Sequence, residues 1–196
     1  MKRRTVFILL TCFFAALISV SCKTAEFGFK VIDLHGMVYD FSNRPVANCE
    51  ISLGKRHNTV TDINGRFTLP KVPIGTYTLT GHRRGFEIYT DEVIVKDRGQ
   101  IIYFRIPSQN QLLDLIDDAL SSNNLVLAEE LAERAYQIDK TNIEMLFYYA
   151  TVKFRQEEYF LATNFLEAAR SLGSRDLFID RFLTILKELQ NAENSN

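Results

Sequence analysis

The spacing of apolar residues along the chain changes once, at Pro107–Ser108. Before this point apolar and polar residues alternate in short runs, as in 67–69, which is the two-residue period of β-strands. From Leu112 onward apolar residues recur three and four positions apart, which is the period of amphipathic helices. The sequence therefore predicts an α+β chain of two domains, with β-structure over 31–107 and helices over 108–190.

The segment 31–107 holds several short apolar runs separated by residues that favour turns. The breaks between the runs lie at Ser42–Pro45, Asp62–Gly65, Pro70–Gly75 and Asp97–Gly99. About seven short strands over ~75 residues are typical of a small antiparallel β-sandwich. We therefore expect this domain to be such a sandwich.

Five motifs follow one another through the same segment. They are Gly36-x-Val38, Arg44–Ile51, Thr61–Phe67, Val72–Leu79 and Gly85-Phe86. In order and spacing they resemble the carboxypeptidase regulatory-like domain, which has a transthyretin-like (prealbumin-like) fold, over roughly 33–106. The resemblance implies an accessory module that brings no catalysis.

Similar residues recur at a constant interval in the helical segment, where Ala128 is matched by Ala162 and Leu125 by Tyr159. In both matches the residue numbers differ by 34, a period that resembles the tetratricopeptide repeat. The resemblance implies five helices, as two helix pairs and a closing helix, followed by a tail. The bounds are 109–142 and 143–176 for the pairs, Asp176–Leu189 for the closing helix and 191–196 for a disordered tail. The glycine and proline of that repeat are missing here, so a plain helical bundle is the alternative.

Residues 1–21 have the order of a secretory signal peptide. Basic residues precede an apolar run from Val6 to Val20, and the small residue Ser21 stands directly before Cys22. Cleavage after Ser21 by an ordinary signal peptidase fits this order. An uncleaved anchor is disfavoured because the run is short for a membrane span.

The segment Leu17–Cys22 also resembles a bacterial lipoprotein signal of the relaxed kind found in spirochaetes. The resemblance implies that Cys22 carries a diacylglycerol and becomes the new N-terminus, with 22–30 as a lipid-anchored linker. We then expect an exported lipoprotein of the outer membrane or of a periplasm-facing membrane, with the membrane itself as one partner.

The net charge argues against nucleic acid as a partner, and its sign differs between the two domains. The formal net charge of -1 gives no electrostatic case for nucleic acid. Residues 1–21 carry three positive charges and no negative one, so the chain from Cys22 onward has a charge of -4. The sandwich segment 31–107 is at +2 and residues 108–196 are at -7. The acidic surplus indicates solvated helix faces or, alternatively, a cationic partner.

Motifs for catalysis and metal binding are missing from the sequence. None of His35, His57 and His82 is followed by glutamate at the spacing that a zinc carboxypeptidase needs. The run Asp62–Gly65 predicts a turn rather than a calcium loop. Cys49 shares a strand face with apolar residues and is expected to be a buried thiol. We expect no enzyme activity, no metal and no cofactor.

These observations favour a non-enzymatic cell-envelope lipoprotein that acts as a scaffold or assembly factor by binding another envelope protein. The alternatives are a module that binds glycan or peptidoglycan, and an accessory subunit of an exported hydrolase. By the register of the repeat, the first helix of each pair lines the partner-binding groove. The expected groove residues are Leu113, Asp117, Leu120, Phe147, Thr151 and Phe154. An aromatic pair at this spacing also fits a helical core, so burial of both phenylalanines is the competing interpretation.

Overall fold

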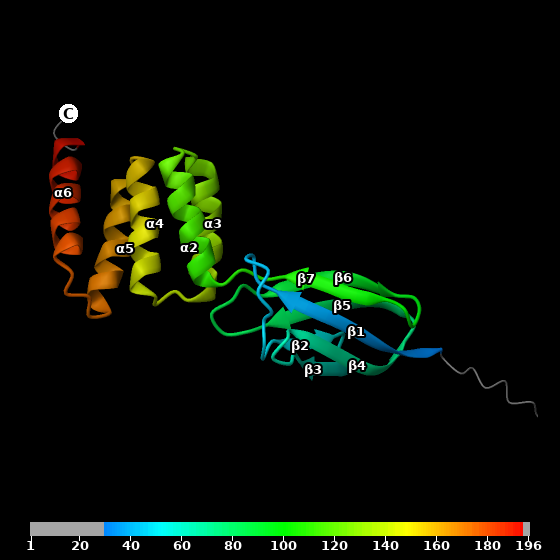
Figure 1. Cartoon of the computed structure of the whole chain (residues 1–196). Helices are drawn as coiled ribbons and strands as arrows, with labels where there is room; N and C mark the ends of the chain where they lie inside the picture. The colour runs from blue at the N-terminus through cyan, green and yellow to red at the C-terminus, as the bar shows by residue number, and fades with distance from the viewer. Residues whose placement is uncertain (1–29, 194–196) are drawn as a thin grey trace, which may run out of the picture. The chain divides into compact units, whose positions relative to one another are not determined.

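The computed structural model describes residues 30–193. Seven strands come first along the chain (Figure 1). They are β1 (Val31–Tyr39), β2 (Glu50–Leu53), β3 (His57–Val60), β4 (Arg66–Pro73), β5 (Gly75–His82), β6 (Tyr89–Val95) and β7 (Ile101–Arg105). Five helices follow, and the strands and helices belong to one compact unit. The predicted two-part α+β architecture is confirmed.

The strands form two sheets, in the orders β4-β1-β7 and β3-β2-β5-β6. The pairings within the described residues are antiparallel except for β1 and β7, which run parallel with His35 opposite Ile101 and Tyr39 opposite Arg105. The expected seven-stranded sandwich is confirmed, with this one pairing as a difference. The pairing joins the first and last strands, so alternation within either strand gives no sign of it.

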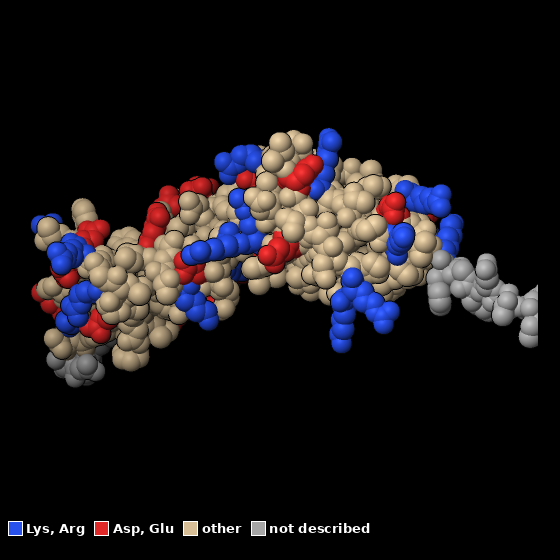
Figure 2. Space-filling model, turned by 90° about the horizontal axis from the view of Figure 1, so that it is seen from below, with Lys and Arg blue, Asp and Glu red and all other residues tan. Residues whose placement is uncertain are grey.

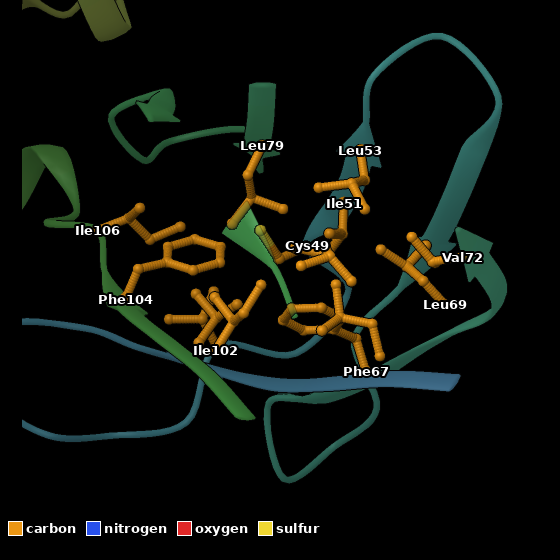
Figure 3. Close-up of a cluster of buried hydrophobic side chains, with 14 of the residues drawn as sticks. Cys49, Ile51, Leu53, Phe67, Leu69, Val72, Leu79, Ile102, Phe104 and Ile106 are labelled. Atoms are coloured by element: carbon orange, nitrogen blue, oxygen red, sulfur yellow. The ribbon is translucent and has the colours of Figure 1, made fainter. Parts of the chain in front are cut away.

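Alternate side chains of the central strands fill the space between the two sheets. In β1 every second residue from Ile32 to Val38 is buried, and in β7 the buried residues are Ile102 and Phe104. Removal of these apolar surfaces from water stabilises the sandwich. Figure 3 shows much of this cluster, which contains Cys49, Ile51, Leu53, Phe67, Leu69, Val72, Leu79, Ile102, Phe104 and Ile106.

The turn Asp62–Gly65 is tied together by the first residue of the run. The Oδ1 atom of Asp62 accepts hydrogen bonds from the backbone N–H groups of Asn64 and Arg66, at 2.8 and 2.9 Å. Gly65 has a φ of 70°, in the left-handed region where a Cβ is disfavoured. The predicted turn is confirmed.

The five helices begin at evenly spaced positions in two series, 109, 143 and 177, and 125 and 159. They are α2 (Gln109–Ser121), α3 (Leu125–Ile138), α4 (Ile143–Arg155), α5 (Tyr159–Ser171) and α6 (Leu177–Glu193). The start of α2 is fixed by a capping box between Ser108 and Gln111. Helix α6 ends four residues beyond the predicted Leu189, so it includes the first residues of the expected tail. The helix can continue there because neither Asn191 nor Ala192 is a glycine or proline.

Two apolar clusters hold the helices together. One is centred on α2, α3 and α4, and the other on α4, α5 and α6. The ring of Tyr149 stacks on Phe165 at 4.2 Å between centroids, and Tyr136 packs edge-on against both rings. Small side chains such as Ala128 and Ala162 are fully buried, which lets neighbouring helices approach closely.

Candidate functional site

The three predicted groove residues of α2 lie in different environments. Leu113 and Leu120 are only 3% and 7% exposed and belong to the core formed with α3 and α4. Asp117 is exposed. The two leucines face inward because the apolar stripe of α2 packs against its neighbours, so Asp117 alone of the three offers its side chain to a partner.

The predicted residues of α4 are half-buried, and α6 covers part of them. The ring of Phe182 in α6 packs against Phe147 at 6.1 Å and against Phe154 at 5.2 Å, measured between centroids. The hydroxyl of Thr151 donates a hydrogen bond to the carbonyl of Phe147 at 2.9 Å. The structure thus joins the two phenylalanines through a closing helix, and the six predicted residues do not form one open groove.

The exposed side of α2 and α4 carries an acidic surface around Tyr148. Burial first, and then the carboxylates of Asp117, Glu144 and Asp114, raise the pKa of the Tyr148 hydroxyl. A half-buried aromatic ring with surrounding carboxylates can contact a cationic segment of a partner. We call these four residues the acidic face. The sequence identified Asp117 but not Tyr148, because the register of the repeat selected Phe147 and Thr151 in this helix.

A second surface lies at the starts of α3 and α5, where apolar residues at equivalent positions of the two pairs are exposed. Val126 in α3 is 81% exposed and Phe160, its equivalent in α5, is 72% exposed. The next residues, Leu127 and Leu161, are exposed too. We call these four residues the exposed apolar row. The interval of the repeat shows that these positions are equivalent in α3 and α5. It does not show that they are exposed, because apolar residues in a helical pattern are normally assigned to the core.

Lys153 connects the two helix starts that carry this row. Its side chain is 8% exposed, and its ammonium group bonds Glu129 in α3, Gln156 at 3.1 Å and Glu158 at 3.3 Å. Burial lowers the pKa of Lys153, but the hydrogen bonds and charges of the two glutamates more than offset this, and the pKa is raised. The ion network thus links α3 to Glu158, the residue before α5, through the last turn of α4.

The outer face of the sheet β4-β1-β7 exposes aromatic side chains. Tyr103 in β7 lies opposite Met37 in β1, and the hydroxyl of Tyr39 contacts the sulfur of Met37 at 3.6 Å. A surface hollow of about 420 Å³ is lined by Tyr39, Asn43, Tyr103, Phe104 and Arg105. Aromatic rings beside polar and cationic groups can stack on sugars and hydrogen-bond their hydroxyls.

A further hollow, of about 500 Å³, lies where the segment after β5 meets α3. It is lined by 82–88, Glu133, Arg134, Gln137 and Ile138. The guanidinium of Arg83 stacks over the ring of Phe86 at 4.7 Å. Arg134 forms an ion pair with Glu87, so two of the charged groups here are already bound within the chain.

The part of the chain that the structure describes holds no group of three or more His, Cys, Asp or Glu side chains placed to bind a metal ion. Cys49 is fully buried, as predicted, and burial raises the pKa of its thiol to about 11. A thiol with such a pKa is protonated at neutral pH and is a poor nucleophile.

No helix within residues 30–193 is both long enough and apolar enough to span a membrane. Cys22, the predicted lipid attachment residue, lies outside the described residues.

The fold defines a protein built from a β-sandwich module and a module of five packed helices. Residues 33–103 match the family model of the carboxypeptidase regulatory-like domain. The chain thus contains a carboxypeptidase regulatory-like domain followed by a five-helix region. No curated protein matches the chain.

Solved structures that match part of this chain include an interface mutant of a type II cohesin–X-dockerin complex from Acetivibrio cellulolyticus. It is 18% identical with a TM-score of 0.36, and the match covers 41% of this chain and 60% of that one. Catechol 1,2-dioxygenase from Acinetobacter sp. ADP1 is 9% identical with a TM-score of 0.35, with coverage of 43% and 55%. This chain spans less than two thirds of either, and a likeness at these values carries no conclusion about function.

Proposed function

We propose that this protein is a non-enzymatic lipoprotein of a bacterial cell envelope, and that its helical region binds another envelope protein. Cys22 carries the lipid, the β-sandwich is a spacer or docking module, and the helices are tetratricopeptide-like repeats. The support for the anchor is the sequence: a signal-like segment ends in the small residue Ser21 directly before Cys22.

The helix positions support the repeat. Helices α2, α4 and α6 begin at equal intervals along the chain, and α3 and α5 are separated by the same interval. Equivalent residues have equivalent environments, since Ala128 and Ala162 are both fully buried while Val126 and Phe160 are both exposed. A period that extends to single side chains is typical of repeat proteins, in which each unit contacts its neighbours and presents the same surface.

The exposed apolar row is the observation that carries the proposed binding function. Each half of the row is a pair of neighbouring exposed apolar residues, and contiguous exposed apolar surface is typical of sites that a partner covers. Lys153 links α3 to Glu158, the residue before α5, so the helices that carry the two halves of the row need little ordering on binding. Phe160 is the strongest candidate for a residue that dominates the affinity, because aromatic side chains are enriched at such positions.

Affinity purification from crosslinked cells tests the proposal. The double variant Val126→Ser and Phe160→Ser should lose the crosslinked partner and unfold at nearly the wild-type temperature, because both side chains are exposed. Phe178→Ser is the matched control, since Phe178 is 70% exposed but lies outside the row. Retention of every crosslinked protein by the double variant would contradict the proposal.

A glycan-binding function is the second candidate, because Tyr39 and Tyr103 lie beside Arg105 on the outer sheet face. Under this alternative, purified cell-wall glycan retains the protein on a column, and Tyr103→Ala releases it. The substitution Phe160→Ser should leave that retention unchanged. Binding under the first candidate thus depends on Phe160, whereas binding under the second depends on Tyr103.

A further inference from the structure

The turns at one end of the β-sandwich come together through the strand register. Val31 at the start of β1 lies opposite Pro73 at the end of β4, and Gly75 at the start of β5 lies opposite Val95 at the end of β6. The turn after β2 points toward this end too, because β2 runs antiparallel to β5 and the N–H of Gly54 donates to the carbonyl of Thr78 in the middle of β5. The strand β1 therefore begins at the end where three turns meet.

These turns are rich in exposed cations. We call the following set the basic end: Lys55, Arg56, Lys71, Lys96 and Arg98. Figure 2 shows Lys and Arg side chains projecting at this end of the sandwich. Among residues 30–193, no ion pair involves any of the five. Their charges are therefore available to an external anion.

The carboxylates beside these cations already accept hydrogen bonds from the backbone. Asp33 accepts from the N–H of Lys71 at 3.0 Å, and Asp97 accepts from the N–H of Gly99 at 2.8 Å. The first of these bonds lies at an irregularity in the register between β1 and β4. At this irregularity Lys71, in β4, has a φ of 53°. A left-handed conformation is costly for a residue with a Cβ, and here it occurs at a cation of the basic end.

Two cations of the basic end line one hollow. Lys71 and Arg98 share a surface hollow of about 480 Å³ with Asp33 and His35. A phosphate group between the two cations would gain charge-assisted hydrogen bonds from both. Ile74, at the tip of the turn between β4 and β5, adds an exposed apolar side chain at the same end.

We propose that the basic end docks on anionic phospholipid headgroups, with a headgroup phosphate in the Lys71–Arg98 hollow and Ile74 at the level of the headgroups. The inference rests on the proposed anchor at Cys22 for its choice of partner. Val31 lies nine positions after Cys22, and a chain of this length spans at most about 30 Å, so a lipid on Cys22 keeps this end close to the bilayer. Charge complementarity then favours an anionic surface.

Vesicle sedimentation with unlipidated protein tests the charge requirement. The chain from residue 22 to 196 with Cys22→Ser keeps every described strand and helix. At an ionic strength of about 0.1 M it should bind vesicles of phosphatidylglycerol and phosphatidylcholine, and vesicles of phosphatidylcholine alone weakly. Each cation removed should lower the partition coefficient about fivefold. The double variant Lys71→Gln and Arg98→Gln should therefore bind about 25-fold more weakly.

The matched control is Arg66→Gln with Arg105→Gln, which removes the same charge from exposed positions at the opposite ends of β4 and β7. This control should stay within about twofold of the parent protein, because charges beyond a Debye length of ~10 Å contribute little. An equal loss in both double variants, or equal binding to neutral vesicles, would overturn the proposal.

A fluorescent reporter tests the orientation, since the chain contains no tryptophan. Ile74→Trp should shift its emission to shorter wavelength when anionic vesicles are added. Ile63→Trp, in the turn Asp62–Gly65, should not shift. A shift at position 63 alone would show that another face meets the bilayer and would refute the orientation.

The anchor and the docking surface can fail separately. Fatty-acid labelling of cells tests acylation of Cys22, whereas the vesicle assay uses protein that carries no lipid. If the protein is labelled with fatty acid but its basic end does not bind anionic vesicles, this inference alone is refuted. Unlabelled protein that still binds anionic vesicles through Lys71 and Arg98 would refute the anchor alone.

Discussion

Arg134 in α3 donates two hydrogen bonds to the carboxylate of Glu87, from Nε to Oε1 at 2.8 Å and from Nη2 to Oε2 at 2.9 Å. Glu87 follows β5, so this paired contact connects the helical region to the sandwich across 47 positions of sequence. Both side chains are about one third exposed. The backbone supports the same junction, since the N–H of Gln109 donates to the carbonyl of Gly85 at 3.0 Å.

The first prediction concerns this ion pair. Arg134→Gln removes the paired geometry and should lower the free energy of unfolding by about 1–2 kcal/mol, between the values for exposed pairs and for charge-assisted bonds in the interior. Urea denaturation measures the change. Arg170→Gln is the control, because its pair with Glu167 is exposed and 3.7 Å long, and it should change stability by less than about 0.5 kcal/mol. Equal effects of the two substitutions would show that the junction gains nothing from Glu87.

The second prediction concerns close packing at Gly36 in β1. A Cβ added there would overlap the ring of Phe67 and lie 2.8 Å from the carbonyl oxygen of Ile102. Gly36→Ala should therefore destabilise the sandwich by about 3 kcal/mol through overpacking. Gly99→Ala is the control, since the nearest atom to its added Cβ, in Asp97, would be 3.4 Å away.

The side chain of Phe67 offers a second test of this close approach. The combination of Gly36→Ala with Phe67→Leu should cost less than the sum of the two single changes, because the smaller side chain vacates the space. A fully additive pair in thermal unfolding would contradict the steric account.

Local pattern accounts for the strands and helices but not for every pairing. The alternation around Phe67 and the turn at Asp62–Gly65 are local, so the sequence indicates them directly. The parallel pairing of His35 with Ile101 depends on the chain crossing from β6 in one sheet to β7 in the other, which no local period encodes. The irregularity at Lys71 likewise arises from a contact with Asp33, 38 residues away.

In the candidate site, too, the local pattern predicts the positions of the helices but not the contacts between them. The constant interval in the helical segment predicts where each helix pair begins, and it relates Leu113 in α2 to Phe147 in α4. It does not predict that Phe182 covers Phe147, because that contact depends on the angle at which α6 packs. Nor does it predict that Lys153 is buried, since a lysine in a helical pattern is normally assigned to the solvent side. Its burial depends on ion pairs with Glu129 and Glu158, both of which lie outside its own helix.

The third prediction uses the network around Lys153. The hydrogen bond from Lys153, followed by that from Gln156, holds the pKa of Glu129 below its ordinary value of 4.5. A carboxyl with a lowered folded-state pKa stabilises the protein above its ordinary pKa, and that contribution is lost as the pH falls through the lowered value. Wild-type protein should therefore lose more stability than Lys153→Met between about pH 5 and pH 3.

Urea unfolding at several pH values measures this difference. The comparison of variants removes the contribution of other acidic groups, which titrate in both proteins. Lys187→Met serves as the control, because Lys187 is exposed on α6, and its pH profile should follow that of the wild type. Parallel profiles for Lys153→Met and the wild type would show that the network does not set the pKa of Glu129.

The fourth prediction compares two phenylalanines that lie close together in sequence but differ in environment. Phe154 is half-buried and packs against Phe182 and Tyr159 at 5.2 and 5.9 Å between ring centroids. Phe160 is largely exposed. Phe154→Ala should therefore lower the free energy of unfolding by about 2–4 kcal/mol, somewhat less than for a fully buried ring. Phe160→Ala should change it by less than about 0.5 kcal/mol.

The same two substitutions should have the opposite order of effect on partner capture. At a temperature where both variants are folded, Phe160→Ala should reduce recovery of the crosslinked partner, because its ring belongs to the exposed apolar row and is available for contact. Phe154→Ala should retain the partner, because its ring already packs against α6. Thermal unfolding and affinity purification of the same protein preparations check both expectations. Loss of the partner in Phe154→Ala alone, with normal unfolding, would instead place the binding surface on α4, where the register of the repeat first predicted it.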